Sequence, residues 1–198
     1  MSKKDVLKTY RAKRDFEKTP EPSGKKGRKG KGNIYVMQKH AASHLHYDLR
    51  LQIGGVLVSW AVPKGPSTDP RIKRLAIQTE DHPLDYANFE GVIPEGYGAG
   101  TVMVWDIGTY ENIKDISMQT ALKEGRIEIN LHGKKLQGAY ALIQTTYDKA
   151  GGKKQWLFFK MKDDYADARR NPVSTQNKSA LTGRTMAQIK KDKDAVYE

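Results

Sequence analysis

From residue 34 onward, the sequence is divided into short runs in which apolar and polar residues alternate. Such alternation predicts β-strands, because successive side chains of a strand point to opposite faces. One helical segment stands out, Ser117 to Glu124, with Ser117 as its N-cap and Gly125 closing it. We therefore expect a mainly β fold, a small β-barrel or sandwich with one or two short helices. The expected strands are Ile34–Gln38, His46–Ile53, Val56–Val62, Leu75–Thr79, Thr101–Ile107, Arg126–Leu131, Ala139–Thr146 and Gln155–Met161.

Two further local patterns refine this expectation. Gly54-Gly55, between the second and third strands, predicts a two-residue hairpin turn, because both positions tolerate positive φ. The sequence Gly96-Tyr97-Gly98-Ala99-Gly100 is not followed by a helix, so we expect a tight approach between loops rather than a phosphate-binding P-loop. The aromatic residues of the strand patterns are expected mostly in the core: Trp105, Tyr110, Tyr140, Trp156, Phe158 and Phe159.

Positive charge is concentrated at the N-terminus. The 198 residues carry 35 Lys+Arg and 23 Asp+Glu, a net charge of +12, of which residues 1–33 hold +8. The run from Pro22 to Gly32 mixes lysine and arginine with glycine and has nothing to bury, so 1–33 is expected to be a flexible basic arm. The arm is either a solvated tail or, as we favour, a segment that binds along the phosphate backbone of a nucleic acid. The barrel is expected over 34–165 and a polar C-terminal tail over 166–198, with a linker at Asn171–Lys178 and a short helix at Thr185–Asp192.

Composition excludes several classes of protein. The absence of cysteine rules out a disulfide-stapled scaffold, thiolate metal sites and cysteine nucleophiles. The longest apolar run, Val56 to Val62, is far too short to span a bilayer, and the N-terminus lacks the apolar segment of a signal peptide. We expect a soluble intracellular protein with no membrane partner and, given its positive charge, a nucleic-acid partner.

The densest group of chemically active residues surrounds the second expected strand. His40, His44 and His46 fall within seven residues, and Asp48 and Arg50 follow at once. Alternation along the strand places His46, Asp48 and Arg50 on one face. The opposite face is apolar and is expected in the core: Tyr47, Leu49, Leu51 and Ile53.

Imidazole and carboxylate together suit a divalent ion such as Mn²⁺, Fe²⁺ or Zn²⁺. His46 and Asp48 supply two ligands from one strand, and His40, after the preceding strand, is the best third ligand. His44 lies in the connecting loop and is expected only to shape it. Arg50 would then lie beside the metal, where its guanidinium fits a phosphate.

A second polar group, Glu80 to Tyr86, follows the strand Leu75–Thr79. The proline after His82 favours an extended backbone that aims the imidazole, which could donate a proton or hydrogen-bond a phosphoryl group. Tyr86 could add a hydroxyl donor. The alternative is a turn that merely ends the strand. Lys64 and Arg74 are either phosphate ligands or ordinary solvated cations.

Four long motifs resemble the phosphoesterase domain of bacterial DNA ligase D. The motifs are Gln38 to Leu51, Ser59 to Pro66, Glu80 to Tyr86 and Phe89 to Gly96. The N-terminal stretches Tyr10 to Phe16 and Thr19 to Pro22 are also similar to that family, and the resemblance covers roughly residues 5–165. One loop departs from the family pattern, because Tyr97 follows Gly96 directly where the family usually has one more residue. The resemblance therefore assigns no role to this loop.

The resemblance implies a β-barrel, Mn²⁺-dependent 3′-end-healing enzyme of non-homologous end joining, with phosphodiesterase and phosphomonoesterase steps. It implies that His40, His46 and Asp48 bind the metal and that Arg50 and His82 contact the scissile phosphate. The nucleophile stays open between water and the neighbouring 2′-hydroxyl. Further positions that match active-site or supporting residues are Tyr86, Gln38, Lys64, Arg74, Arg14, Asp15 and Glu21.

The same resemblance implies a prokaryotic cytoplasmic protein that acts on the 3′ ends of DNA or RNA/DNA. The family's polymerase and ligase domains are not in this sequence, so we expect a stand-alone version. Its partners would be a separate ATP-dependent DNA ligase, a polymerase/primase and Ku.

Two rival interpretations remain. A non-haem Fe(II) oxygenase would combine His46 and Asp48 with the distant His132, although the surrounding cations suit a phosphate better than a neutral substrate. A non-catalytic DNA-end-binding module would need only the arm and the basic residues. In that case the row of His46, Asp48 and Arg50 on one strand face would have no explanation.

Overall fold

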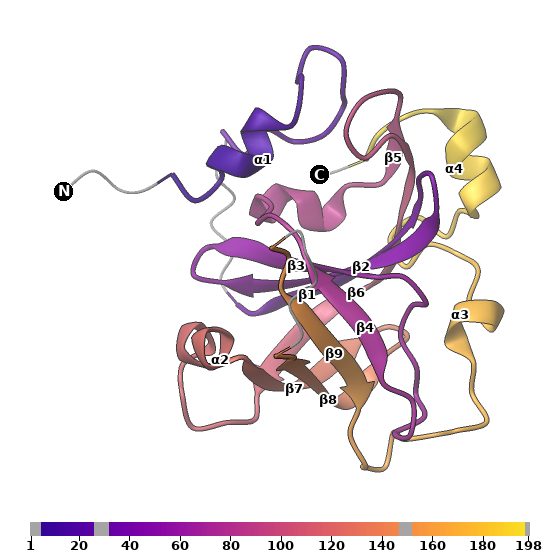
Figure 1. Cartoon of the computed structure of the whole chain (residues 1–198). Helices are drawn as coiled ribbons and strands as arrows, with labels where there is room; N and C mark the ends of the chain where they lie inside the picture. Colours follow the sequence, from indigo (N-terminus) through magenta and orange to yellow (C-terminus); the bar gives the residue numbers. More distant parts are fainter. Residues whose placement is uncertain (1–4, 26–31, 147–151, 197–198) are drawn as a thin grey trace.

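In the computed structural model, which describes residues 5–25, 32–146 and 152–196, eight antiparallel strands close into a barrel (Figure 1). The order around the barrel is β1-β2-β3-β4-β9-β8-β7-β6, and β6 pairs with β1 to close it. A ninth strand, β5, extends the sheet beyond β6 and is the one the sequence pattern missed, because it has only three residues. The strands are β1 (Ile34–Ala41), β2 (Leu45–Ile53), β3 (Val56–Val62), β4 (Arg74–Gln78), β5 (Gly91–Ile93), β6 (Gly100–Asn112), β7 (Arg126–Gly133), β8 (Gln137–Gln144) and β9 (Gln155–Lys160). The barrel prediction is confirmed.

The barrel interior holds the main hydrophobic core, and strand alternation selects its members. The apolar face of β2 lies in it as predicted: Tyr47, Leu49, Leu51 and Ile53. Five of the six predicted core aromatics are buried, but the prediction for Phe159 is wrong. Phe159 is half-exposed because it alternates with the buried Phe158 on β9.

Local signals in the sequence produce the predicted turn and helices. Gly54 and Gly55 both take positive φ, 62° and 85°, as the β2–β3 hairpin requires. Helix α2 (Met118–Glu124) is capped by Ser117 and ends at Gly125, whose φ is 74°. Helix α4 (Met186–Asp192) begins with a capping box at Thr185, and α3 (Pro172–Thr175) occupies part of the expected linker.

The expected flexible arm is corrected for residues 5–25, which fold onto the outside of the barrel. Helix α1 (Lys8–Ala12) presents Tyr10, which is fully buried and donates a hydrogen bond to the Pro22 carbonyl at 2.7 Å. Pro22 is itself buried, so this end of the basic run does have something to bury. The rest of that run, residues 26–31, lies outside the described residues.

The C-terminal region also folds back on the barrel. The side chain of Ile189, on α4, joins the main core, and Val196 forms a backbone bridge with Glu90. Glu90 is buried and pairs with Arg184 at 3.2 Å. These contacts hold residues 179–196 against β5 and β6.

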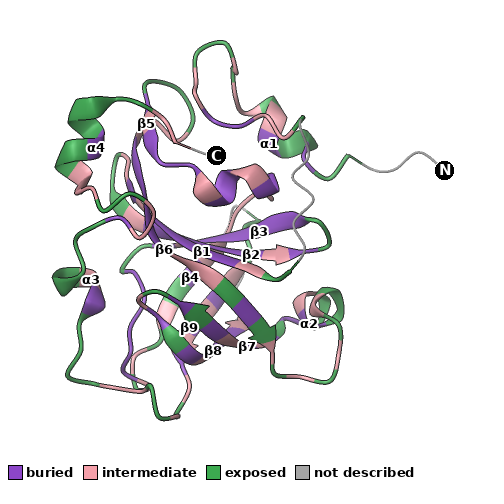
Figure 2. Cartoon of the chain, turned by 180° about the vertical axis from the view of Figure 1, so that it is seen from behind, coloured by how far each residue is buried: buried purple, intermediate pink, exposed green. Residues whose placement is uncertain are grey.

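The sheet formed by β1, β2 and β3 is covered on both sides, as the buried strands in Figure 2 show. Its inner face lines the barrel core. Its outer face carries a second hydrophobic cluster beneath α1 and the 3-10 helix η1 (Leu84–Asn88), and this cluster includes Tyr10, Leu57 and Tyr86. The polar face of β2 opens beside this cluster.

Candidate metal and phosphate site

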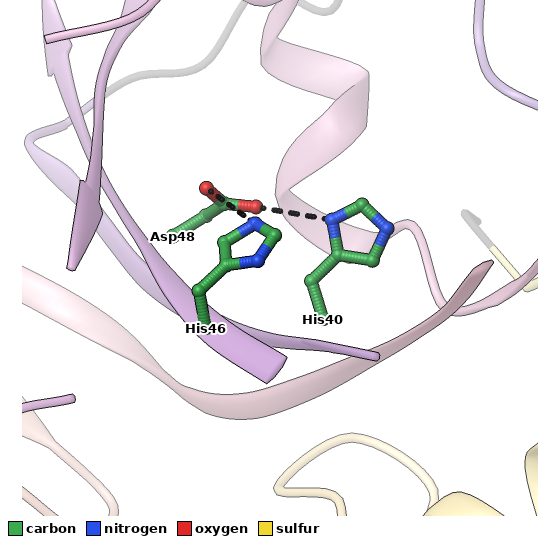
Figure 3. Close-up of side chains that lie close together, drawn as sticks. All are labelled: His40, His46 and Asp48. Atoms are coloured by element: carbon green, nitrogen blue, oxygen red, sulfur yellow. Dashed lines mark ion pairs between the residues drawn. The ribbon is translucent and has the colours of Figure 1, made fainter. Parts of the chain in front are cut away.

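His40, His46 and Asp48 form a compact cluster on the outer face of the barrel wall (Figure 3). His40 at the end of β1 pairs directly with His46 on β2, and Asp48 follows two residues later on the same face. The Asp48 carboxylate faces both rings, 3.6 Å from His40 Nδ1 and 3.6 Å from His46 Nε2. The three ligand atoms lie within 4.8 Å of one another, which is close enough to hold one metal ion.

Backbone carbonyls select the nitrogen that each histidine presents. Nε2 of His40 lies 2.8 Å from the Gly98 carbonyl, and Nδ1 of His46 lies 2.9 Å from the His44 carbonyl. A carbonyl only accepts, so these nitrogens carry the protons and donate. The free lone pairs are therefore on His40 Nδ1 and His46 Nε2, the atoms that face Asp48. Orientation of a ligating imidazole through its other nitrogen is typical of metal sites.

The charges of the cluster also fit a cation. Burial alone would raise the pKa of Asp48, but Arg50, His40 and His46 together hold it well below its usual range. Burial lowers the pKa of His46, yet the adjacent Asp48 carboxylate raises it overall, so a metal ion would replace the proton that Nε2 otherwise shares with Asp48. Two imidazole nitrogens and an ionised carboxylate are a donor set that suits Mn²⁺, Fe²⁺ or Zn²⁺.

Arg50 lies next to the cluster and is 3% exposed. Its Nε donates to Gln38 Oε1 at 2.7 Å and its Nη2 donates to Asp48 Oδ2 at 3.2 Å. Gln38 in turn donates to the carbonyls of Tyr86 and Phe89, so its side chain holds Arg50 instead of facing a substrate. The guanidinium is thus fixed beside the metal cluster.

His82 is buried on the other side of Arg50. Its backbone forms a two-way bridge with Leu57 at 2.8 and 2.9 Å, which confirms the extended conformation expected before proline. Nδ1 lies 2.9 Å from the Glu80 carbonyl and 3.1 Å from Arg50 Nη1, and Nε2 lies 3.4 Å from Arg14 Nη2. Burial and the nearby charges of Arg50 and Arg14 hold the pKa of His82 well below its ordinary value. His82 is neutral at neutral pH.

Residues 5–25 contribute a buried ion pair to the same site. Arg14 Nε donates to Glu21 Oε1 at 2.9 Å, and Tyr86 donates its hydroxyl hydrogen to the same oxygen at 2.8 Å. Arg14 also pairs with Glu80 at 3.2 Å. Burial and the charge of Glu21 raise the pKa of Tyr86 well above its usual value, so it stays a phenol and a donor. This network joins the N-terminal segment to η1 and to His82.

A cavity of about 500 Å³ is lined by the three candidate metal ligands, by Arg50, His82 and Tyr86, and by Arg14, Glu21 and Glu80, but not by Gln38. Its ionisable lining consists of three cationic and three anionic residues besides the histidines, so its net formal charge is zero. The charged residues are Arg14, Arg50, Lys153, Glu21, Asp48 and Glu80.

Four residues expected at the site do not line this cavity, and Gln38, which holds Arg50, is one of them. Lys64 is exposed on the turn after β3. Arg74 begins β4 opposite Phe158, a residue of the barrel core. Asp15 is exposed and begins the turn that runs to Lys18, where its side chain accepts from the Glu17 amide. The structure does bring the other expected residues together in this cavity. They are the three candidate metal ligands and Arg50, His82, Tyr86, Arg14 and Glu21.

Sequence reasoning missed several groups of the site. The carbonyls of His44 and Gly98 hold the histidines, and no side-chain pattern signals a backbone acceptor. Glu80 lies in the polar group singled out above but was given no role, and nothing in the local sequence of Lys153 separates it from other surface charges, yet both line the cavity. The loop 96–100 does make the expected close approach, because a Cβ on Gly100 would lie 2.2 Å from the Ala41 carbonyl oxygen.

The oxygenase interpretation is wrong in its choice of ligand. His132 lies on β7 and pairs with Glu111 at 3.4 Å, and the metal-competent group among the described residues contains His40 instead.

A group of side chains that could hold a metal, in one cavity with buried arginines, is a suitable arrangement for binding a phosphate ester. Residues 38–144 match the family model of the DNA ligase D 3′-phosphoesterase domain. The match covers more than half of the chain and includes the metal cluster, Arg50 and His82. The chain belongs to this phosphoesterase-domain family.

Individual relatives agree with the family. A multifunctional non-homologous end joining protein LigD of Pseudomonas aeruginosa is 49% identical over 91% of this chain and 22% of its own length. A multifunctional non-homologous end joining DNA repair protein LigD of Mycobacterium tuberculosis is 48% identical over 80% of this chain and 20% of its own length. The chain thus spans about a fifth of these relatives. None of the described helices is long and apolar enough to cross a membrane.

Proposed function

We propose that this protein is a Mn²⁺-dependent 3′-end-healing phosphoesterase. It would remove 3′-terminal ribonucleotides by a phosphodiesterase step and 3′-phosphates by a phosphomonoesterase step, leaving a ligatable 3′-hydroxyl. The observation that carries the proposal is the cluster of His40, His46 and Asp48 beside the buried Arg50 in one cavity. The relatives' part in non-homologous end joining supports DNA ends as the substrate.

The residues divide the chemistry between them. A divalent ion held by His40 Nδ1, His46 Nε2 and Asp48 would supply a Lewis acid for a phosphoryl oxygen. Arg50 would direct its guanidinium hydrogens at the same phosphate, from a position fixed by Gln38 and Asp48.

His82 would begin the reaction as a neutral imidazole. The charges of Arg50 and Arg14, which lower its pKa, are the charges that a bound phosphate neutralises. Phosphate binding would therefore raise the pKa of His82, so that the ring can take up a proton and hydrogen-bond the phosphoryl group. This order of events favours His82 as a group that stabilises the transition state. It disfavours a general acid that is already protonated before the substrate binds.

The proposed setting is the end-joining reaction of a prokaryotic cytoplasm. There the healed 3′-hydroxyl would pass to a polymerase/primase and an ATP-dependent DNA ligase, with Ku holding the ends.

The test is a cleavage assay on a 5′-labelled primer–template that ends in a few 3′-ribonucleotides, with a second substrate that ends in a 3′-phosphate. Mn²⁺, EDTA, His46→Ala and His132→Ala are compared. His132→Ala is the matched control, because this exposed histidine lies outside the cavity. We expect trimming and phosphate release that need Mn²⁺, are lost in His46→Ala and persist in His132→Ala. Binding without cleavage in any metal would overturn the proposal and leave a DNA-end-binding module.

A further inference from the structure

Tyr97 is an exposed aromatic residue at the rim of the cavity. Among the described residues, the large apolar side chains that stay exposed include two tyrosines, Tyr97 at 45% and Tyr165 at 54%. Tyr97 lines the cavity with the metal cluster, whereas Tyr165 lies in a different groove. No role has been assigned to Tyr97 in the phosphate chemistry above.

Contacts with Lys13, Arg14 and Glu80 hold the ring of Tyr97 in place. The ammonium group of Lys13 lies over the ring, 4.4 Å from its centroid, and the Arg14 guanidinium lies 5.5 Å from the same centroid. The Tyr97 hydroxyl donates to Glu80 Oε2 at 3.3 Å, and the Glu80 side chain is only 4% exposed. A ring anchored at its hydroxyl needs little ordering when a ligand stacks on it.

The loop of Tyr97 is tied directly to the metal cluster. Gly96 and Gly98, on either side, take φ of 83° and 79°, which form the turn that presents the ring. The carbonyl of Gly98 is the acceptor for His40. A nucleotide whose phosphate lies at the metal cluster would therefore have its base within reach of this ring.

A second cavity, of about 360 Å³, adjoins the first, and the two share Arg14, Glu21, Gly96 and Tyr97. The second is also lined by two cations, Lys13 and Lys18, and by two anions, Asp15 and Glu95. Tyr97 thus borders both the phosphate site and a second groove in which the rest of the strand would lie.

We propose that Tyr97 is the platform on which the base of the 3′-terminal nucleotide stacks. This inference rests on the proposed function and names the part of the substrate that a phosphate site alone does not recognise. Stacking on an aromatic ring accepts any base, so the platform would align the end of a strand without sequence preference. Lys13, over the same ring, strengthens the site through its charge.

The test measures binding without cleavage. A primer–template whose 3′-terminal ribonucleotide carries 2-aminopurine is titrated in EDTA with the wild type, Tyr97→Ala, Tyr97→Phe and Tyr165→Ala. Stacking quenches 2-aminopurine. We expect Tyr97→Ala to lose the added quenching and to weaken binding roughly 5- to 150-fold, the range of one base stack. Tyr97→Phe keeps the ring, and Tyr165→Ala removes an exposed tyrosine elsewhere, so both should match the wild type within a few-fold.

A matched end that lacks the terminal base separates stacking from a general loss of structure. On this abasic end, Tyr97→Ala should bind as tightly as the wild type. An equal loss of affinity on both ends, or equal quenching by wild type and Tyr97→Ala, would overturn the inference. Its failure is distinguishable from that of the proposed function. Cleavage in Mn²⁺ with no Tyr97 effect refutes only the platform, while Tyr97-dependent stacking with no cleavage refutes only the enzyme.

Discussion

Replacement of Arg50 by lysine tests whether the site depends on the shape of the guanidinium or only on its charge. Arg50 reaches three groups at once: Gln38 Oε1 at 2.7 Å, Asp48 Oδ2 at 3.2 Å and His82 Nδ1 at 3.1 Å. One ammonium group cannot span these positions. In Arg50→Lys we expect the pairing with Asp48 to persist and the contact with Gln38 to be lost.

The magnitudes follow from these contacts. Loss of one preorganised donor to a phosphoryl oxygen typically lowers kcat about 100- to 1000-fold. The buried Gln38 oxygen would be left without its donor, which costs about 1–3 kcal/mol in the free energy of unfolding. Because His40, His46 and Asp48 remain, we expect the Mn²⁺ dissociation constant to rise less than about tenfold, the low end of the effect of losing a group that hydrogen-bonds a metal ligand.

Three measurements check this prediction: kcat on the ribonucleotide-ended primer–template, urea unfolding, and Mn²⁺ titration followed by electron paramagnetic resonance. An unchanged kcat would show that charge alone suffices. A fall in Mn²⁺ affinity that matches the fall in kcat would show that Arg50 acts only by positioning Asp48, and would refute a direct contact with phosphate.

The remaining predictions concern the other parts of the site. Because the pKa of His82 is lowered by folding, the unfolded state binds its proton first as the pH falls. The free energy of unfolding, measured with urea, should therefore be highest above about pH 6.5. Below that pH it should decrease by at most about 1.4 kcal/mol per pH unit, and the decrease should be smaller in His82→Asn. Glu21→Gln removes the buried partner of Arg14. It should increase amide exchange over 5–25 and lower activity about 10- to 100-fold, whereas the exposed Glu17→Gln should do neither. The cavity has zero net formal charge without a metal, so EDTA should weaken binding of 3′-phosphate ends more than of 3′-hydroxyl ends; equal weakening would contradict this view.

The cluster of His40, His46 and Asp48 was predictable because it depends on strand periodicity and on the register of one hairpin. Once His46–Ile53 is a strand, one face must carry His46, Asp48 and Arg50, and the hairpin register brings His40 opposite His46. Every step of that inference spans fewer than a dozen residues. Local patterns of this kind also gave the cap at Ser117 and the turn at Gly54.

The rest of the site depends on contacts between distant parts of the chain. Glu21 meets Tyr86 across 65 positions, and Arg14 meets His82 across 68. No periodicity relates such pairs, and here the family resemblance identified residues whose partners the sequence could not show. The same resemblance gave Lys64 and Arg74, which lie outside the cavity in this structure. Motif matching transfers a residue's identity but not the position of its side chain.

The N-terminal segment affects the site by enclosing it rather than by adding charge. It was expected to attract phosphates as a basic arm, yet within the cavity it places one cation, Arg14, and one anion, Glu21, so the net charge is unchanged when it docks. What docking does change is solvent access, because Tyr10 and Arg14 cover His82 and leave it 3% exposed. Charges interact more strongly where water is excluded, so a closed segment would strengthen the attraction between Arg50 and a phosphate. Lys13 and Lys18, along the neighbouring groove, are likewise paired, with Glu80 at 3.0 Å and Glu95 at 3.2 Å, so docking adds no unpaired lysine there either.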